Sequence, residues 1–515
     1  MKTDRRGLFR WIAGALTAAS GAAAGEHALA IHAETGNTRF GSLGIRLRSL
    51  RDPLSAFKPY ADSKRVGLPP PVSSTMSLAS SVRGYEPTPG FRKDAVSLAA
   101  LSRILQLTNG VTGRMAAGER DLRLRAAPSA GALYSGEVYV VAERVLGLNP
   151  GVYYYAVLEH ALVALRSGSF MGRVGAALEA PAGVSSAPAA VLLTNIFRRY
   201  RHRYANRGYR FALIDSGHIG ENLRLASRSS GFGEMCALRF HDDALNELLG
   251  VDGREESVCA VHAIGFPGKV AVAAPRALGE MQRVDLAALM PRGGAPDRYH
   301  QATKLTPAPT ARPKLQPLAP RVRAAPGVVL VKGRTNPRTA LEETIRNRRS
   351  ASVFHNEPMA LADLAFVLEM ARGYDSLRRT PGVEIHVVVH RVRDLASGIY
   401  RYEPEGPRLG LVRAGNLRLE MESACLGQEK AGEAAAGLAM VARLAESVSR
   451  AGERSYRDLL IEAGGMAQRV YLAAEAVGAV ARNLAAFLDD EFNALLGLDG
   501  RREAVVHLTM LGPGR

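Results

Sequence analysis

The chain has 515 residues, of which 47% are hydrophobic and 23% charged, a globular balance that allows a sizeable buried core. The formal net charge is +18 and arginine dominates the basic residues, so anionic ligands, nucleic acid and membrane headgroups stay open as partners. A biased genome composition would give the same excess. The three cysteines (Cys236, Cys259 and Cys425) form no CxxC motif, which excludes a framework of paired disulfides.

Residues 1–30 have the layout of an export signal. Arg5-Arg6 precede a weakly apolar, alanine-rich run from Trp11 to about Ala24, and Ala28-Leu29-Ala30 supplies the small residues of a cleavage site. The run is too short, and too poor in Leu and Ile, to span a bilayer stably. The segment resembles a twin-arginine signal, so we expect a periplasmic protein. The alternative is an amphipathic N-terminal helix of a cytoplasmic protein.

The expected elements alternate irregularly along the chain. An irregular lead-in at 31–75 precedes a helix at 98–105, strands at 137–141, 151–155 and 189–194, a long helix at 212–229 and a strand at 257–264. Residues 290–336 are rich in Pro, Ala and Arg, which is typical of a linker. The second half repeats the order with a helix at 361–371, strands at 384–390 and 398–402, a helix at 463–476 and a strand at 504–510. This pattern predicts an α+β fold.

One heptapeptide occurs twice and sets the register of a long internal repeat. Residues 248–254 read LLGVDGR and residues 495–501 read LLGLDGR, an offset of 497 − 250 = 247 residues. The same offset pairs Gly217 with Gly464 and Asp242-Asp243 with Asp489-Asp490. A period this long excludes a solenoid and indicates a duplicated domain. We therefore expect one domain at 76–289 and a second at 337–515.

Three patches have residues suited to binding a ligand. A turn of small residues runs from Arg125 to Tyr134, and such a turn lets backbone amides approach a planar or anionic group. Residues 346–350 read RNRRS, where guanidinium groups and a hydroxyl can hold a phosphate. Gly-rich turns follow the long helices at Gly231 and Gly478. Taken singly, these patches are equally typical of a turn, a basic helix face and a helix cap.

Together and in this order, the patches resemble the nitroreductase superfamily, and specifically its SagB/ThcOx-type dehydrogenases. The most specific strings are PSAGALY at 128–134, the long-helix segments at 207–226 and 456–474, and NRRS at 347–350. The resemblance implies two nitroreductase-like domains, each a mixed β-sheet flanked by helices. It also implies FMN bound non-covalently at a dimer interface, where an RRS-type segment holds the phosphate from one subunit and a PSxG-type loop meets the ring from the other.

Each half of this chain keeps the part that the other half lacks. In the first copy Ala79-Ser80-Ser81-Val82-Arg83 replaces the RRS segment, and in the second copy residues 379–384 replace the PSAGALY loop. We therefore expect an intrachain pseudo-dimer, a monomer, with one composite flavin site and an empty or weak mirror site. The implied FMN-binding residues are Arg348, Arg349, Ser350, Pro128, Ser129, Gly131, Ala485, Ala486 and Arg515.

The implied catalytic residues precede the first long helix. Azoline-oxidising relatives have a Lys-Tyr pair there that is implicated in deprotonating the substrate; Tyr204 matches, but Arg203 takes the place of the lysine. Arginine stays protonated and cannot act as a base, although it can lower the pKa of a phenol or bind a carboxylate. The resemblance implies an FMN-dependent oxidoreductase acting on an azoline peptide, a nitro compound or a quinone, with NAD(P)H or another electron carrier as a partner.

Two other classes of function remain as alternatives. Arginines interleaved with tyrosines at 198–210 could bind nucleic acid, although the segment matches a loop of the family and we expect no nucleic-acid partner. A duplicated domain can also decay to a flavin-free scaffold or binding protein. His202 and His218 are expected to be structural, and no His, Cys and Asp residues have the spacing of a metal site.

Overall fold

A computed structural model describes most of the chain. The described residues are 26–37, 55–60, 63–85, 88–117, 120–178, 183–268, 295–305, 327–330, 337, 339–373, 382–404 and 406–515. The expected arginine pair Arg5-Arg6 and residues 379–381 of segment 379–384 lie outside these ranges. None of the described helices is both long and apolar enough for a membrane span.

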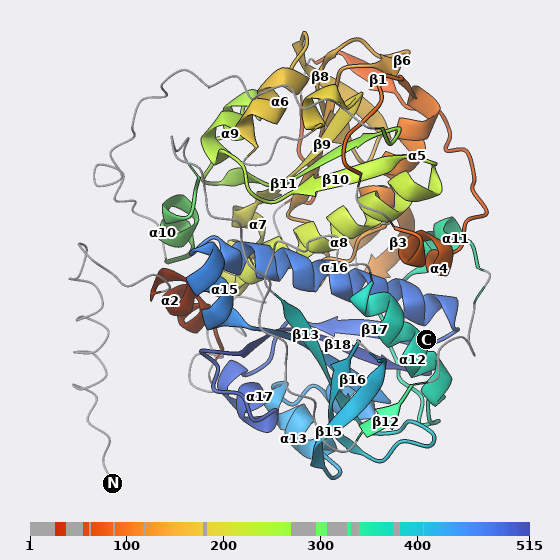
Figure 1. The fold of residues 1–515 in the computed structure, drawn as a ribbon, viewed down its shortest axis with the longest axis vertical. Helices are drawn as coiled ribbons and strands as arrows, with labels where there is room; N and C mark the ends of the chain where they lie inside the picture. The colour runs from red at the N-terminus through yellow and green to blue at the C-terminus, as the bar shows by residue number, and fades with distance from the viewer. Residues whose placement is uncertain are drawn as a thin grey trace.

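Two seven-stranded sheets with the same strand order form the two halves (Figure 1). The first has the order β1 (Arg65–Gly67), β8 (Ala161–Ser167), β7 (Gly151–Ala156), β5 (Gly136–Ala142), β9 (Ala189–Ile196), β11 (Glu256–Gly265), β10 (Gly233–Ala237). The second has the order β12 (Gly327–Val329), β15 (Arg408–Ala414), β14 (Gly398–Glu403), β13 (Val383–Val389), β16 (Ala436–Ala442), β18 (Ala504–Gly512), β17 (Val480–Leu484).

The described strand pairs within both large sheets are antiparallel. Parallel pairing occurs in a small separate sheet of β2 (Val96–Ser97) and β6 (Val145–Leu146). A fourth sheet is the antiparallel hairpin of β3 (Val111–Ala117) and β4 (Arg120–Arg125). The α+β prediction is confirmed. Parallel and antiparallel strand pairs both occur, but the parallel pair lies in the small sheet of β2 and β6 and not in a large sheet.

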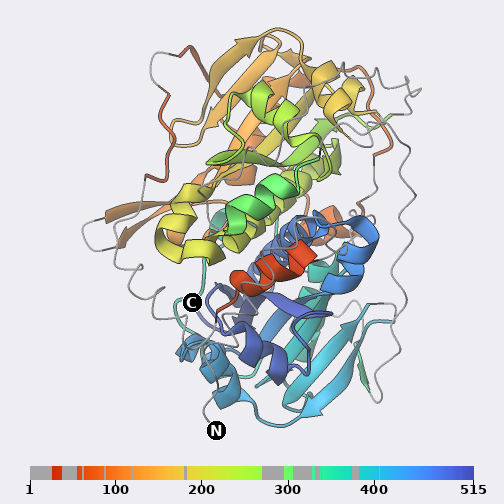
Figure 2. The ribbon, with the colours of Figure 1, turned by 90° about the vertical axis from the view of Figure 1, so that its left-hand side faces the viewer.

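The helices lie mainly between and around the two sheets, as Figure 2 shows. In the first half they are α2 (Glu26–Glu34), α4 (Leu78–Arg83), α5 (Leu98–Asn109), α6 (Met171–Ala177), α7 (Phe197–Tyr204), α8 (Gly208–Ser229), α9 (Asp242–Leu249) and α10 (Ala295–Ala302). In the second half they are α11 (Leu341–Asn347), α12 (Leu361–Arg372), α13 (Arg418–Ala424), α14 (Glu429–Glu433), α15 (Leu444–Ala451), α16 (Ser455–Ala476) and α17 (Asp489–Leu495). Adding 247 to the bounds of α8 gives the bounds of α16.

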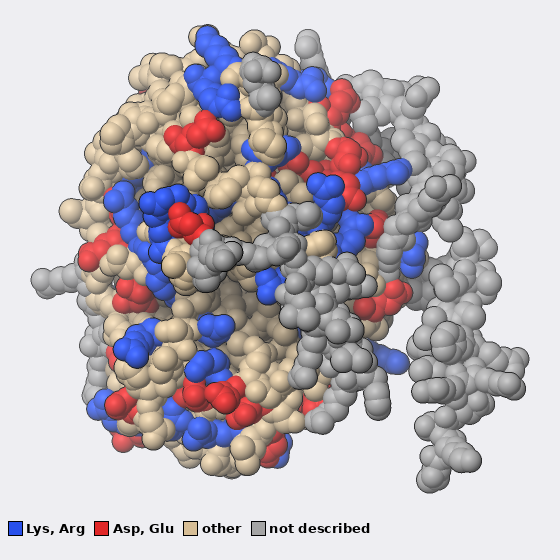
Figure 3. All heavy atoms as spheres, turned by 180° about the vertical axis from the view of Figure 1, so that it is seen from behind, with Lys and Arg blue, Asp and Glu red and all other residues tan. Residues whose placement is uncertain are grey.

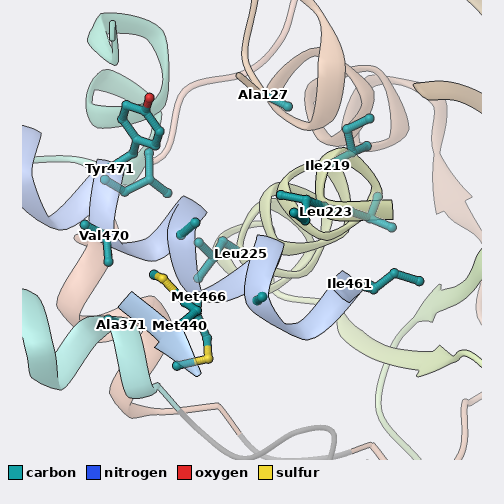
Figure 4. Close-up of a cluster of buried hydrophobic side chains, with 14 of the residues drawn as sticks. Ala127, Ile219, Leu223, Leu225, Ala371, Met440, Ile461, Met466, Val470 and Tyr471 are labelled. Carbon is teal, nitrogen blue, oxygen red and sulfur yellow. The ribbon is translucent and has the colours of Figure 1, made fainter. Parts of the chain in front are cut away.

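The long helices α8 and α16 join the two halves by direct backbone contact. A Cβ atom on Gly217 would overlap the carbonyl oxygen of Ile461, and one on Gly464 would overlap that of Ile214. Only glycine allows two helices to approach this closely. Around the crossing, Met466, Val470 and Leu223 are buried in one hydrophobic cluster that contains side chains of both halves (Figure 4).

Two reciprocal clusters, each of two arginines and one aspartate, fix the ends of these helices. Arg207 and Arg210 at the start of α8 bind the two carboxylate oxygens of Asp489 in the other half, each at 2.5 Å. The equivalent Arg454 and Arg457 at the start of α16 bind Asp242 at 2.5 and 3.0 Å. All six side chains are nearly inaccessible to solvent. Buried charges need such pairing, because an unpaired one would carry an uncompensated desolvation cost.

Two short helices outside the predicted domains repeat this symmetry. α2 spans the end of the predicted signal segment and the start of the predicted lead-in, and α10 lies in the predicted linker, so neither the lead-in nor the linker is irregular throughout. The His32 imidazole contacts the Tyr456 hydroxyl at 3.2 Å, and His300 contacts Tyr209 at 3.1 Å. The predicted cleavage residues 28–30 lie inside α2, and the Ala28 N–H donates to Glu453 at 2.5 Å. Cleavage after Ala30 would therefore divide a packed helix.

The repeated LLGxDG turns are structural. Gly250 and Gly497 both have φ +72, and they follow α9 and α17. The carboxylate of Asp252 accepts hydrogen bonds from three backbone N–H groups, at residues 254, 255 and 256, and Asp499 does the same at 501, 502 and 503. Side-chain to backbone bonds of this kind fix a turn. The segment that is most similar between the two copies therefore has a structural role.

Substituting Gly217→Ala should destabilise the fold by about 3 kcal/mol, since the new methyl group must push α16 away from α8. Chemical denaturation measures this change. The matched control is Gly172→Ala in α6, where a Cβ meets nothing within 4 Å. Equal stability of the two variants would show that the helices do not touch as described.

Substituting Asp489→Ala should cost about 3–5 kcal/mol, because it leaves Arg207 and Arg210 buried without their partner. The exposed neighbour Asp490 is the control for the same substitution. Although burial opposes ionisation, the two arginines hold the pKa of Asp489 at about 2, below its ordinary value of 3.8. The wild-type protein should therefore lose this stabilisation as the pH falls from about 4 to 2, and the Asp489→Ala variant should show a smaller loss over that range.

Candidate functional site

Arg348 extends from the second half into the first. It caps the end of α11, and its side chain is buried, with a relative exposure of 5% for the residue. The Nε atom donates to the carbonyl of Ala126 at 3.1 Å and Nη2 to that of Arg125 at 3.3 Å. The third guanidinium nitrogen, Nη1, has no hydrogen-bond partner among the described residues. A buried guanidinium nitrogen without an acceptor is costly unless a ligand supplies one.

The PSAG loop of the first half follows immediately after those carbonyls. Pro128 is buried and Gly131 is exposed with φ +63, a left-handed conformation that favours glycine. The Ser129 hydroxyl contacts the Tyr200 hydroxyl at 2.6 Å and accepts the N–H of Tyr134 at 2.8 Å. These hydrogen bonds therefore fix the shape of the loop, and the backbone of Gly131 is exposed on it.

Behind the loop lies a buried polar network that the sequence did not reveal. The Tyr200 hydroxyl donates to Asp215 on α8 and accepts the N–H of Ala130 at 3.0 Å. Burial raises the pKa of Asp215 to about 7, although the hydrogen bonds from Tyr200 and Ser129 oppose the rise. Burial also raises the pKa of Tyr200, and Asp215 adds to that effect. Asp215 and Tyr200 thus position Ser129 from inside the domain.

Tyr204 and Arg203 lie at the exposed edge of the same loop. A Cβ atom built on Gly131 would lie 2.6 Å from the Tyr204 hydroxyl oxygen and 3.5 Å from an Arg203 nitrogen. The Arg203 guanidinium is 5.8 Å from the centre of the Tyr204 ring. Burial raises the pKa of Tyr204, whereas Arg203 partly lowers it. The structure therefore brings the two predicted catalytic residues to the predicted flavin loop.

Strand β17 supplies the third side of the site. The amide of Asn483 donates to His218 Nε2 at 3.0 Å, and its backbone N–H donates to the Tyr471 hydroxyl at 2.8 Å. Tyr471 also contacts the Ser350 hydroxyl at 2.9 Å and lies under the Arg348 guanidinium at 5.2 Å. Burial lowers the pKa of His218 to about 3, with Arg348 adding to the effect, so this imidazole is neutral.

The remaining predicted site residues lie around this core. Arg349 is exposed, and its Nη2 atom donates to the carbonyl of Thr112 in the first half at 3.0 Å. The carbonyls of Ala485 and Ala486 accept from Arg207 at 3.0 Å and Gln428 at 2.6 Å, which fixes both peptide groups. The backbone of Arg515 pairs with that of Val353, whereas its side chain is exposed.

The mirror position differs in chemistry. Arg83, where the first copy lacks the RRS segment, forms a bidentate ion pair with Glu369 at 2.8 and 2.9 Å. This pairing occupies the guanidinium with a protein carboxylate. The composite arrangement of Arg348 against the PSAG loop is thus present on one side of the pseudo-dimer.

Several arginines of segment 198–210 form ion pairs with acidic side chains of the protein. Arg199 binds Glu137 at 2.5 Å, and Arg207 and Arg210 bind Asp489. Arg201 pairs with Asp297 at 2.8 Å. Basic and acidic side chains are interspersed on the face seen in Figure 3. Phosphate contacts need exposed cations, and the buried members of this segment cannot provide them.

Substituting Asp215→Asn should flatten the pH dependence of folding stability between about pH 4 and 7. Because the folded state raises the pKa of Asp215 from 3.8 to about 7, its contribution to stability is complete below pH 4 and declines as the pH rises. The slope should be at most about 1.4 kcal/mol per pH unit. Denaturation at several pH values measures it, with the exposed Asp490→Asn as control. An unchanged slope would contradict this assignment.

Comparisons with known proteins agree with this architecture. The sequence model of the nitroreductase family matches residues 90–266 and 345–513, one region in each half. "Putative nitroreductase MJ1384" of Methanocaldococcus jannaschii is 30% identical over 171 residues, covering 33% of this chain and 80% of that protein. The crystal structure of a "putative nitroreductase" from Anabaena variabilis has a TM-score of 0.74 and 27% identity, covering 95% of this chain and 99% of that one.

The Escherichia coli microcin synthetase McbBCD complex aligns with 47% of this chain and 94% of that one, at 22% identity and a TM-score of 0.32. The family match covers (266 − 89) + (513 − 344) = 346 of the 515 residues, in two tandem regions. The Anabaena alignment extends over both halves. The chain belongs to the nitroreductase family and contains two nitroreductase-like domains in tandem.

Proposed function

We propose that the protein is an FMN-dependent oxidoreductase with one composite flavin site between its two domains. The observation that carries the proposal is Arg348, which crosses from the second domain to the carbonyls of Arg125 and Ala126 and retains a buried Nη1 that has no partner among the described residues. A guanidinium that two carbonyls hold in place, with one nitrogen still available, can donate hydrogen bonds to a phosphate. The family as a whole supports oxidoreductase chemistry, whereas the choice of FMN and of one site is our inference.

The residues around Arg348 suit the two ends of a flavin mononucleotide. Arg348 and the exposed Ser350 hydroxyl would hold the phosphate, with Arg349 adding positive charge beside them. The exposed, left-handed backbone at Gly131 would approach the planar ring, as Ser129 holds the loop in place. When bound, FMN supplies the hydride or electron transfer, and the protein orients the substrate.

Tyr204 and Arg203 are the residues that we assign to the substrate. Both lie beside Gly131, where a bound substrate would meet the ring. Because burial raises its pKa, the Tyr204 phenol stays protonated at neutral pH and can donate a hydrogen bond. Arg203 can bind an anionic group but cannot remove a proton. This pair favours binding and proton donation over the substrate deprotonation that a lysine would permit.

The substrates that the resemblance offers are azoline-containing peptides, nitro compounds and quinones, with NAD(P)H or another carrier as the electron partner. Of these, Tyr204 and Arg203 favour reduction of a nitro compound or a quinone, since reduction consumes protons that a neutral phenol can donate. Asp215 and Tyr200 act through Ser129 and are positioning residues.

The purified protein should contain one FMN per chain, and Arg348→Ala should lower that occupancy at least tenfold by removing the phosphate partner. Absorbance of the heat-released flavin against protein concentration measures the ratio. The matched control is Arg83→Ala at the mirror position, where the arginine is paired with Glu369, and occupancy should stay at the wild-type value.

Two flavins per chain would refute the single composite site. A correctly folded wild-type protein that binds no added FMN would refute the enzyme and support the flavin-free scaffold. Because Arg348 is buried, its variant also needs a melting temperature to separate unfolding from loss of the ligand. Ser350→Ala, at an exposed position, gives a second test with less risk to folding.

A further inference from the structure

A cavity lies between α8 and α16. The pseudo-symmetry of the two domains would put the mirror flavin site in this place. Its volume is about 60 Å³, room for a ligand of a few heavy atoms. Its lining includes Glu234, Cys236 and His262 of the first sheet. Adding 247 to these numbers gives 481, 483 and 509, which are Ala481, Asn483 and Thr509 of the second sheet. The chemistry of the two places therefore differs.

Cys236, His262 and Glu234 form a connected row. Cys236 and His262 are register partners on the adjacent strands β10 and β11, and the Sγ to Nε2 distance is 3.9 Å. The other imidazole nitrogen, Nδ1, contacts the Glu234 carboxylate at 2.6 Å. Glu234 precedes Cys236 by two residues, so both side chains lie on one face of β10. A thiol, an imidazole and a carboxylate in this order are the arrangement of an activated nucleophile.

The neighbours of the imidazole favour its charged form. Burial disfavours the charged ring, but Cys236 and Glu234 outweigh burial and raise the pKa of His262 to about 10. Glu234 and His262 have relative exposures of 2% and 4%, whereas Cys236 is partly exposed. The sulfur is thus the accessible member of the row. The row escaped the sequence analysis because its residues come from two strands and pair only in the sheet.

Three arginines and the carboxylates of Glu221 and Glu462 also line the cavity. Arg224, with a relative exposure of 4%, binds Glu221 through Nε and Nη2, while its Nη1 has no partner among the described residues. Arg372 and Arg469 also line the cavity. A buried guanidinium nitrogen that lacks an acceptor, next to a cavity, indicates an anionic or acceptor group in the ligand.

We propose that Cys236 is a reactive thiolate, held by the His262 imidazolium, in a second site that takes a small electrophile bearing a carboxylate. Glu234 positions the imidazole, and Arg224 receives the carboxylate. In the covalent step the sulfur lone pair attacks the electrophilic carbon and a carbon–sulfur bond forms. The bond to the leaving group breaks, and that group departs with the electron pair, so no oxidant or proton is required.

The geometry favours this reading over a bound metal ion. Glu234, Cys236 and His262 each offer one ligand atom, and these atoms lie within 4.8 Å of one another. The contact of 2.6 Å between His262 Nδ1 and the Glu234 carboxylate leaves Sγ and Nε2 unengaged by that pair. Structural zinc takes four protein ligands and catalytic zinc three.

The test compares iodoacetate with neutral iodoacetamide on the full-length protein, with peptide mass spectrometry to locate the label. At pH 6.5 both should label Cys236 and spare Cys259 and Cys425, which are buried and whose pKa values burial raises. Cys236 should react about tenfold or more faster than a free cysteine, of which only about 1% is ionised at this pH. Iodide is the leaving group in both cases.

Four variants assign the roles. Cys236→Ser should abolish the label. His262→Asn should slow labelling at pH 6.5 about tenfold or more and have little effect at pH 9.5, where any exposed thiol ionises. Arg224→Gln should slow iodoacetate more than iodoacetamide, as should Arg372→Gln, which guards against misfolding of the first variant. The other charged or titratable groups around the row are Tyr85, Glu221, Arg372, Glu462 and Arg469, and all stay unchanged in the His262 variant.

The proposal is overturned if Cys236 reacts with the pH profile of a free cysteine, or if iodoacetate has no advantage that Arg224 controls. If the protein contains one zinc ion per chain and Cys236 reacts only after that zinc is chelated, the site is a metal site and the proposal is wrong. A second FMN in the cavity would replace it by a flavin site. Flavin content is measured separately on the same samples, so failure of the composite flavin site leaves this test intact.

Discussion

The backbone contact of α8 with α16 is the constraint on which the other features depend. At Gly217 and Gly464 the two helices meet without side chains between them, which brings the loops of each domain within reach of the other. The reciprocal pairs of Arg207 and Arg210 with Asp489, and of Arg454 and Arg457 with Asp242, then prevent the helices from rotating about that point. Only in this geometry can Arg348 bond to the carbonyls of Arg125 and Ala126.

The scaffold is symmetric, whereas the ligand-facing residues are not. Residues that hold the domains together recur at the offset of 247, as the arginine–aspartate pairs do. Residues that face the two interdomain positions differ: Tyr471 corresponds to Arg224, and Asn483 to Cys236. In one position these residues surround Arg348, whose Nη1 has no partner among the described residues, and in the other they belong to a thiol–imidazole row with a buried arginine beside it. The two copies thus share the residues that pack the domains together and differ in the residues that face the two sites.

Much of the fold could be predicted from the sequence, because hydrophobic periodicity and the exact spacing of the repeat are local properties. All the strands and helices expected in both halves occur, although α8 and α16 begin earlier than expected, at Gly208 and Ser455. Helices α2 and α10 were missed, since His32 and His300 are 268 residues apart and do not follow the offset of 247. The network of Tyr200 with Asp215 and the row of Cys236 with His262 were missed because they form only through tertiary contacts. Asp242 and Asp489 did appear in the aligned repeat, but a one-dimensional pattern does not show that each binds the other domain.

The crossing of Arg348 into the first domain within a single chain has a genetic consequence. In a symmetric homodimer every substitution is present twice and alters both interdomain sites at once. Here a substitution in the PSAG loop changes one site only, and a substitution at Cys236 changes the other only. Selection can therefore act on the two positions independently while α8 and α16 keep them a fixed distance apart. A covalent pair of domains is free to acquire two unlike sites, which a dimer of identical subunits cannot do.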